Sequence, residues 1–161
     1  QLLPPGLVGK DRPNIGMMVP QTTAAALVSE NKALGWPASL DSIPTCEDQE
    51  DHIAMSTVAS RRARKVLRNA QRVIAIELLS AYEALRFRLE ESSDTTLGIG
   101  VQAAVQHLEQ LLTELPSKCT IGEQIEHIAT DIHLGNLLQA VPELISSTQQ
   151  DIQPQNSGDL R

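Results

Sequence analysis

The feature that most constrains the fold is a stretch from about Gln49 to Leu89 that contains neither proline nor glycine. On a helix of 3.6 residues per turn, basic residues spaced by four, three and four positions fall on one stripe, and small or aliphatic residues fall on the opposite face. The stripe consists of Arg61, Lys65, Arg68 and Arg72, with Arg64 at its edge. The pattern predicts one long amphipathic helix over about 49–89.

This predicted helix is longer than its own chain can accommodate. From Val73 to Leu85 it becomes apolar on nearly every side, and a helix that is apolar all round is normally buried all round. About 40 residues span roughly 60 Å, whereas a compact chain of 161 residues has a diameter of about 40 Å. We therefore expect an all-α, long-helix bundle that is completed by other chains or by further sequence of the same protein.

The remaining segments support an all-α architecture, because none shows the alternation typical of a strand. Residues 1–20 are a loop-rich lead-in with several prolines and glycines. The helical segment is expected over 21–141, with the long helix preceded by one helix and followed by two. The expected shorter helices cover 21–34, 99–115 and 120–140, and the polar residues 142–161 are expected to form a flexible tail.

Composition narrows the possible functions. The net charge of −7 and an aromatic content of 2% give no support to nucleic-acid binding, which needs positive charge and stacking side chains. No apolar run approaches the roughly 18 residues of a membrane span. Cys46 and Cys119 do not make a disulfide framework, so we expect two free thiols and a cytoplasmic location.

An acidic cluster, Glu47–Asp51, precedes the basic stripe and is followed by His52. One interpretation is a helix start, in which Thr45 or Asp48 caps the long helix and the acids complement its dipole. Another is a catalytic carboxylate. A metal site is disfavoured, since consecutive carboxylates followed by His52 cannot all converge on one ion.

Other polar residues have simpler interpretations. The basic stripe is typical of a solvated helix face, with phosphate binding or a salt-bridge seam between subunits as alternatives. His107, His127 and His133 lie on amphipathic segments and are expected to be structural. Cys46 has no histidine placed to activate it as a nucleophile.

Three motifs carry a specific resemblance. They are TAAALVSENK (Thr23–Lys32), PASLDSIPT (Pro37–Thr45) and QEDHIAM (Gln49–Met55). The whole stretch 14–85 resembles the C-terminal half of the histidine ammonia-lyases, in the aromatic amino-acid lyase family. The residues from 99 to 141 resemble the end of that family's sequences more loosely.

The resemblance implies a fold and a chemistry. Members are nearly all-helical homotetramers with a central bundle of long helices, and they eliminate ammonia from an amino acid, here L-histidine to give urocanate, without a metal. Their electrophile is a methylidene-imidazolone group made from an internal Ala-Ser-Gly in the N-terminal half, which this chain lacks. The chain is therefore expected to be inactive alone and to need that half as a partner.

The resemblance also implies the site residues. Glu50 corresponds to the glutamate of the QED motif, which lies near the substrate imidazole and is expected to be catalytic and substrate-binding. Gln49 is expected to orient Glu50 through its amide, and Met18 to line the substrate pocket. In phenylalanine and tyrosine lyases a glutamine usually replaces this glutamate, so Glu50 favours histidine as the substrate.

Departures from the family pattern leave alternatives open. Asp48 stands where the family commonly has asparagine, and Ile15 where it commonly has serine. The sequence NSGDL in the tail, Asn156–Leu160, has asparagine in place of the ring-forming alanine and is interpreted as a coincidence. A non-catalytic oligomerisation or regulatory module derived from a lyase is one alternative. A tyrosine or phenylalanine ammonia-lyase, or a related aminomutase, is another.

Overall fold

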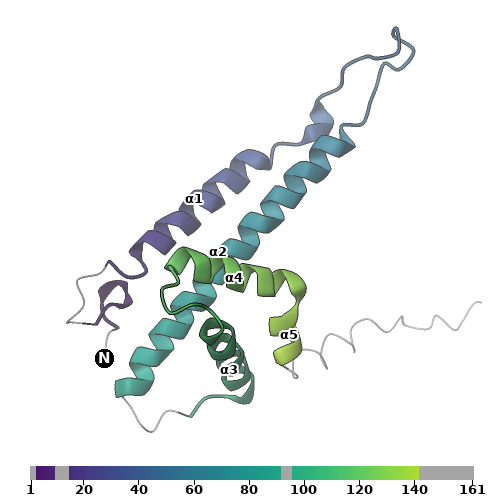
Figure 1. Cartoon of the computed structure of the whole chain (residues 1–161). Coiled ribbons are helices and arrows are strands. Elements are labelled where there is room, and N and C mark those ends of the chain that lie inside the picture. Colours follow the sequence, from purple (N-terminus) through teal and green to yellow (C-terminus); the bar gives the residue numbers. More distant parts are fainter. Residues whose placement is uncertain (1–2, 10–14, 92–95, 142–161) are drawn as a thin grey trace, which may run out of the picture.

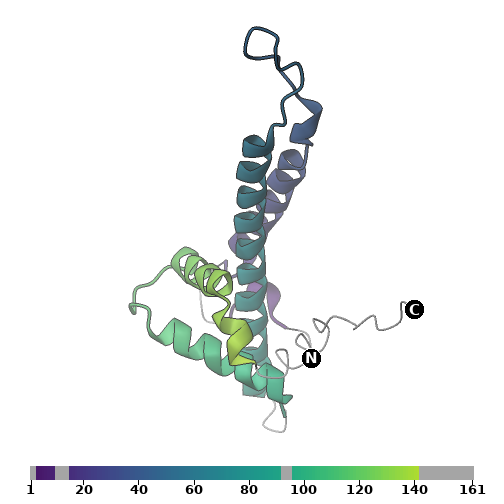
Figure 2. The ribbon, with the colours of Figure 1, turned by 90° about the vertical axis from the view of Figure 1, so that its right-hand side faces the viewer.

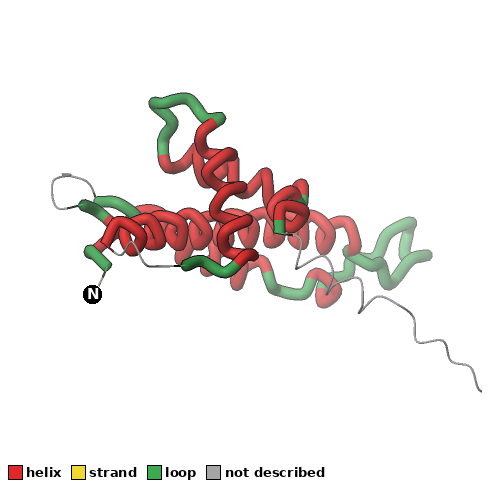
Figure 3. The backbone as a smooth tube through the Cα atoms, turned by 90° about the horizontal axis from the view of Figure 1, so that it is seen from below, coloured by secondary structure: helices red, strands yellow, loops and turns green. Residues whose placement is uncertain are grey.

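The computed structural model describes residues 3–9, 15–91 and 96–141, and within these ranges the chain contains helices and loops but no β-strand (Figure 3). The predicted all-α class is confirmed. In these described ranges, two short 3-10 turns, η1 and η2, accompany five α-helices. They are η1 (Pro5–Leu7), α1 (Met18–Leu34), η2 (Ala38–Leu40), α2 (Ser56–Glu91), α3 (Ile99–Thr113), α4 (Ile121–Leu134) and α5 (Asn136–Ala140).

Helix α2 is the spine of the molecule. Its 36 residues span about 54 Å at 1.5 Å per residue. Helix α1 runs antiparallel along the first half of α2 to form an extended arm, while α3, α4 and α5 gather around the second half (Figures 1 and 2). The loop 41–55, here called the tip loop, joins the two helices of the arm at its far end.

The hydrophobic core lies where α4 crosses α2. Its buried members are Ala75, Ile76 and Leu79 of α2, Leu108 of α3, and Ile125, Ile128 and Ala129 of α4. The helix segment predicted to be apolar on nearly every side is covered on one face only within this chain, and Ile74 remains 45% exposed.

Two polar arrangements hold the helices around the core. Asp131 of α4 is buried and accepts hydrogen bonds from His107 Nε2 of α3 at 2.9 Å and from Asn136 Nδ2 of α5 at 3.1 Å. At the start of α4, Thr120 and Glu123 form a capping box in which each side chain accepts from the other's backbone N–H. These contacts lower the pKa of Glu123.

Helix boundaries differ from the sequence predictions by one or two residues at several ends and by more at three points. Helix α1 begins at Met18 rather than residue 21. Pro20 does not prevent this, because N–H groups in the first turn of a helix have no partner within the helix and the missing one costs nothing. The helix expected over 120–140 breaks at Gly135, whose φ of 77° is the left-handed conformation that ends helices. Helix α2 begins at Ser56 rather than about residue 49. The predicted tail, 142–161, lies outside the described residues.

Within the described part of the chain, no helix combines the length and the apolar character that a membrane crossing requires.

Candidate active site

The tip loop is closed by a short antiparallel pairing. The backbone N–H of Thr45 donates to the carbonyl of Glu50 at 3.0 Å, and that of Glu50 donates back at 3.3 Å. Between them Cys46, Glu47 and Asp48 all adopt left-handed backbone conformations, with φ from 53° to 65°. Such conformations are uncommon outside glycine, so the loop is a tight turn and could not continue as a helix.

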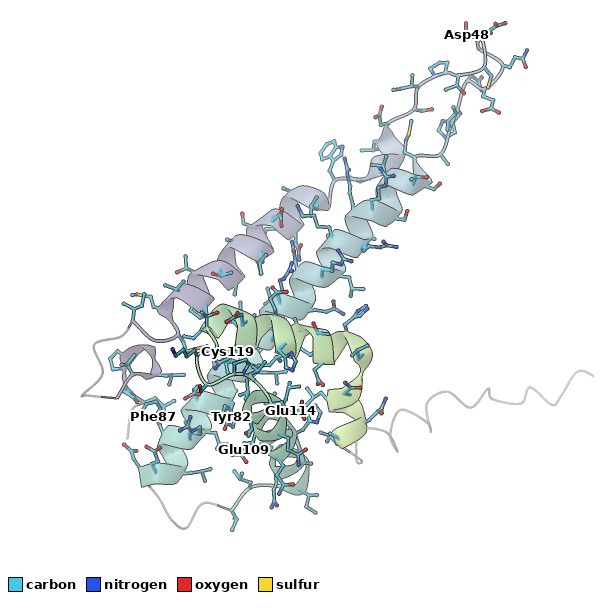
Figure 4. All side chains as sticks on the ribbon, in the orientation of Figure 1. Asp48, Tyr82, Phe87, Glu109, Glu114 and Cys119 are labelled. Carbon is cyan, nitrogen blue, oxygen red and sulfur yellow. The ribbon has the colours of Figure 1, made fainter. Side chains whose placement is uncertain are left out.

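This geometry corrects the interpretation of the acidic cluster. No acidic residue lies in the first turn of α2, and neither Thr45 nor Asp48 is near enough in sequence to cap a helix that begins at Ser56. The helix dipole acts within its own first turn, and Glu50 lies six residues before it. The acids instead lie at the exposed far end of the arm, where Asp48 marks the extreme point (Figure 4).

Glu50 and Gln49 are both exposed at this tip. The hydroxyl of Thr45 lies 3.4 Å from Glu50 Oε2, within reach to donate to it. Sequence reasoning expected Gln49 to orient Glu50, and it missed Thr45. No periodic signal could have found Thr45, because its approach depends on the reversal of the chain between the two residues.

Met18 lies at the opposite end of the arm. It is the first residue of α1 and 54% exposed, and it borders a shallow hollow with Ile15, Gln21 and Ser80. The 17 residues of α1 span about 25 Å, and the tip loop lies beyond their far end (Figure 1). One chain therefore cannot place Met18 and Glu50 against the same small ligand.

The basic stripe is divided between paired and unpaired residues. Arg72 donates two hydrogen bonds to the carboxylate of Glu126, at 2.6 and 3.0 Å, which raise the pKa of Arg72. Lys65 pairs with Glu30 of α1. Within the described residues no ion pair is found for Arg61, Arg64 or Arg68. The stripe is thus partly solvated and partly a connection between helices.

The histidines and cysteines add no catalytic cluster. His133 lies 3.1 Å from the amide of Gln71, and His107 contacts Asp131, as expected for structural histidines. Both cysteines are free thiols. In the part of the chain that the structure describes, no three His, Cys, Asp or Glu side chains converge as metal ligands would.

Comparison with known proteins decides the family. The family model described as "Aromatic amino acid lyase" matches residues 1–110, more than half of the chain. The chain belongs to the aromatic amino acid lyase family. A histidine ammonia-lyase from Alkaliphilus oremlandii is 41% identical over 143 residues, and one from Caldanaerobacter subterraneus subsp. tengcongensis is 59% identical over 86 residues.

Solved lyase-family structures share the fold. The crystal structure of histidine ammonia-lyase from Trypanosoma cruzi superposes with a TM-score of 0.75 at 32% identity, over 88% of this chain and 27% of that chain. A tyrosine aminomutase mutant with bound ligand gives a TM-score of 0.74 at 30% identity. The Alkaliphilus relative is matched over 89% of this chain but 27% of its own length. The chain therefore spans about a quarter of its relatives, as a piece of the lyase fold.

Proposed function

We propose that this chain is the C-terminal part of a histidine ammonia-lyase-like enzyme that eliminates ammonia from L-histidine to give urocanate. The observation that carries the proposal is its 41% identity to a curated histidine ammonia-lyase over 89% of the chain. In this role the chain contributes substrate-binding residues and the long helices of an oligomeric bundle, and it has no activity alone.

Glu50 is assigned the catalytic role at the tip loop. An exposed carboxylate can accept a hydrogen bond from an imidazole N–H or take up a proton. The Thr45 hydroxyl donates a hydrogen bond to one carboxylate oxygen of Glu50 and leaves the other oxygen available for a ligand. Gln49, the preceding residue, is also exposed and carries an amide that can bind the same ligand.

Met18 is assigned to the wall of a substrate pocket. This pocket is not the one that Glu50 of the same chain enters. Because the two ends of the arm are about 25 Å or more apart, a pocket lined by both residues has to combine the tip of one chain with the α1 start of another. This supports a homo-oligomer, and a tetramer is the form expected from the resemblance. A cytoplasmic location remains an expectation of the sequence.

The prosthetic group is assigned to another part of the protein. The sequence contains no Ala-Ser-Gly triplet, so the residues present do not form a methylidene-imidazolone group. That group would supply the electrophile from the N-terminal half of the enzyme. The residues of this chain bind and orient the substrate, and Glu50 holds or accepts a proton.

A joined enzyme tests the proposal. The part of the Alkaliphilus oremlandii histidine ammonia-lyase that precedes the matched region is fused to this chain, and urocanate is followed by its ultraviolet absorbance. We expect turnover of L-histidine, and Glu50→Gln is expected to lower it by about 100-fold or more. This substitution keeps the side-chain length and an oxygen for Thr45, so the loop should remain folded.

Glu47→Gln is the matched control. It removes one negative charge from the same loop, but Glu47 is assigned no contact with substrate, so turnover should stay within about twofold. Equal losses from the two substitutions would show that loop charge matters and Glu50 has no special place. A joined enzyme that folds and oligomerises, yet releases ammonia from no aromatic amino acid, would favour the non-catalytic module instead.

A second candidate activity follows from the structural similarity to a tyrosine aminomutase. The same joined enzyme can be supplied with L-tyrosine and L-phenylalanine, and its products separated by chromatography. Formation of a β-amino acid, or of a cinnamate-type product faster than urocanate, would replace histidine as the assigned substrate.

A further inference from the structure

A polar cluster around one buried amide lies in the middle of the arm, between α1 and α2. Asn69 of α2 is 2% exposed, although asparagine is a residue that is mostly found at the surface. Its Nδ2 donates to Glu30 Oε2 at 2.7 Å and to Asn31 Oδ1 at 2.9 Å. A carboxylate can only accept, so the orientation of this amide is determined by its partners.

Two further contacts tie the cluster across the helix pair. The Nδ2 of Asn31 lies 3.5 Å from the backbone carbonyl of Val66, and Lys65 forms an ion pair with the other oxygen of Glu30. The hydrogen bonds and the nearby ammonium group lower the pKa of Glu30. These polar contacts therefore join one face of α1 to a stretch of little more than one turn of α2, from Lys65 to Asn69.

The apolar contacts of the arm do not by themselves select one alignment of the helices. Pro20 is the only buried residue described in α1. The apolar side chains along its inner side, Ala24, Leu27 and Leu34, are half-buried. None of the three is fully buried, so these apolar contacts specify the register only weakly.

The polar cluster, by contrast, exists in one register only. A shift of α1 by one turn would replace Glu30 and Asn31 by residues three or four positions away. Those residues are Ala26, Leu27, Val28, Ala33, Leu34 and Gly35, and none has a side-chain acceptor. The buried amide of Asn69 would then lose both partners, and an unpaired buried polar group is strongly unfavourable.

We propose that Asn69 is a positioning residue whose buried amide fixes the register of α1 on α2, and with it the place of the Glu50 tip relative to the Met18 end of the arm. This inference rests on the proposed function for its catalytic meaning. Buried polar residues can serve as register devices of this kind between paired helices. A shift by one turn would move the two ends by about 5 Å relative to each other.

Spin-label distances on the 161-residue chain test the register directly. Cys46 and Cys119 are changed to serine, and labels are placed at Gln21→Cys and Arg61→Cys, two exposed positions toward opposite ends of the arm. Because this pair is separated mainly along the helix axes, a slip of α1 changes its distance by nearly the full 5 Å. The parent chain should give one narrow distance distribution.

Asn69→Leu keeps the side-chain size but removes the donor, and it should add a second distance shifted by about 5 Å or broaden the distribution over that range. Glu30→Gln keeps an acceptor oxygen for Asn69 and should leave the distribution narrow. Leu79→Ala destabilises the core away from the cluster and should lower stability without moving the distance. These two controls separate register from charge and from general destabilisation.

If Asn69→Leu does not fold, the double substitution Glu30→Leu and Asn31→Leu replaces it, because it removes both acceptors from the half-buried side of the cluster. An unchanged single distance in whichever of the two variants folds would overturn the proposal. In the joined enzyme, Asn69→Leu should lower kcat/KM by up to about 100-fold, with Glu30→Gln close to the parent. If the joined enzyme has no lyase activity, the proposed function fails, but the distances still decide the register.

Discussion

Ile128 of α4 gives the sharpest test of the packing at the centre of the molecule. It is 1% exposed, the least exposed of the large side chains in the core. Substitution by alanine removes three carbon atoms, which at about 0.8 kcal/mol per buried carbon corresponds to roughly 2.4 kcal/mol. The cavity left between α2 and α4 adds to this, so we expect Ile128→Ala to lower the free energy of unfolding by about 3 kcal/mol.

The same chemical change at an exposed site is the control. Ile99 is 72% exposed at the start of α3, so Ile99→Ala should change the free energy of unfolding by less than about 0.5 kcal/mol. Both values are measured by urea unfolding followed by far-ultraviolet circular dichroism. In a chain of this size about 3 kcal/mol corresponds to a fall in Tm of roughly 6–12 °C. Equal effects of the two substitutions would refute the assignment of the core to the α2–α4 crossing.

Three further predictions follow from local contacts. Thr120→Ala removes the capping box of α4 and should cost about 1 kcal/mol in urea unfolding; no loss would mean that the box does not hold the helix start. Burial and the nearby Glu123 carboxylate raise the pKa of Cys119, so its alkylation at neutral pH should be slower than that of an unstructured cysteine. Alkylation should accelerate in Glu123→Gln, and an unchanged rate would exclude the charge effect. The pKa of Glu30 lies below its ordinary 4.5, so its stabilising contribution is present above that pH and is lost as the pH falls through the folded value. Glu30→Gln should therefore flatten the acid side of a plot of the free energy of unfolding against pH. Parallel plots for the two proteins would contradict this.

Helix content and order were predictable because they depend on local periodicity. The core residue Ile128 lies on the face of α4 predicted to be apolar. In α2 the core residues Ile76 and Leu79 instead lie in line with the basic stripe. By contrast Leu67 and Ile74, on the face predicted to be apolar, are 56% and 45% exposed.

The break at Gly135 was missed because a single glycine can be tolerated inside a helix as well as end one. Its left-handed φ of 77° accompanies hydrogen bonds from its backbone N–H to the carbonyls of Asp131 and Ile132, which close α4.

The tip loop was not predictable in the same way. Acidic residues without proline or glycine were consistent with a helix start, yet Cys46–Asp48 take left-handed conformations that few sequences favour. The pairing of Thr45 with Glu50 arises from chain reversal and has no sequence period. The family resemblance directed attention to Glu50, Gln49 and Met18, but the separation of Met18 from the tip is visible only in three dimensions.

The fixed alignment of α1 on α2 has a consequence for how the arm can change over evolutionary time. One residue inserted into α1 would turn everything beyond it by about 100° and lengthen the helix by about 1.5 Å, so the amide of Asn69 would meet a different face. A compensating insertion in α2 would be needed at the matching height. Insertions and deletions should therefore be confined to the tip loop. The lengths of α1 and α2 should change only together.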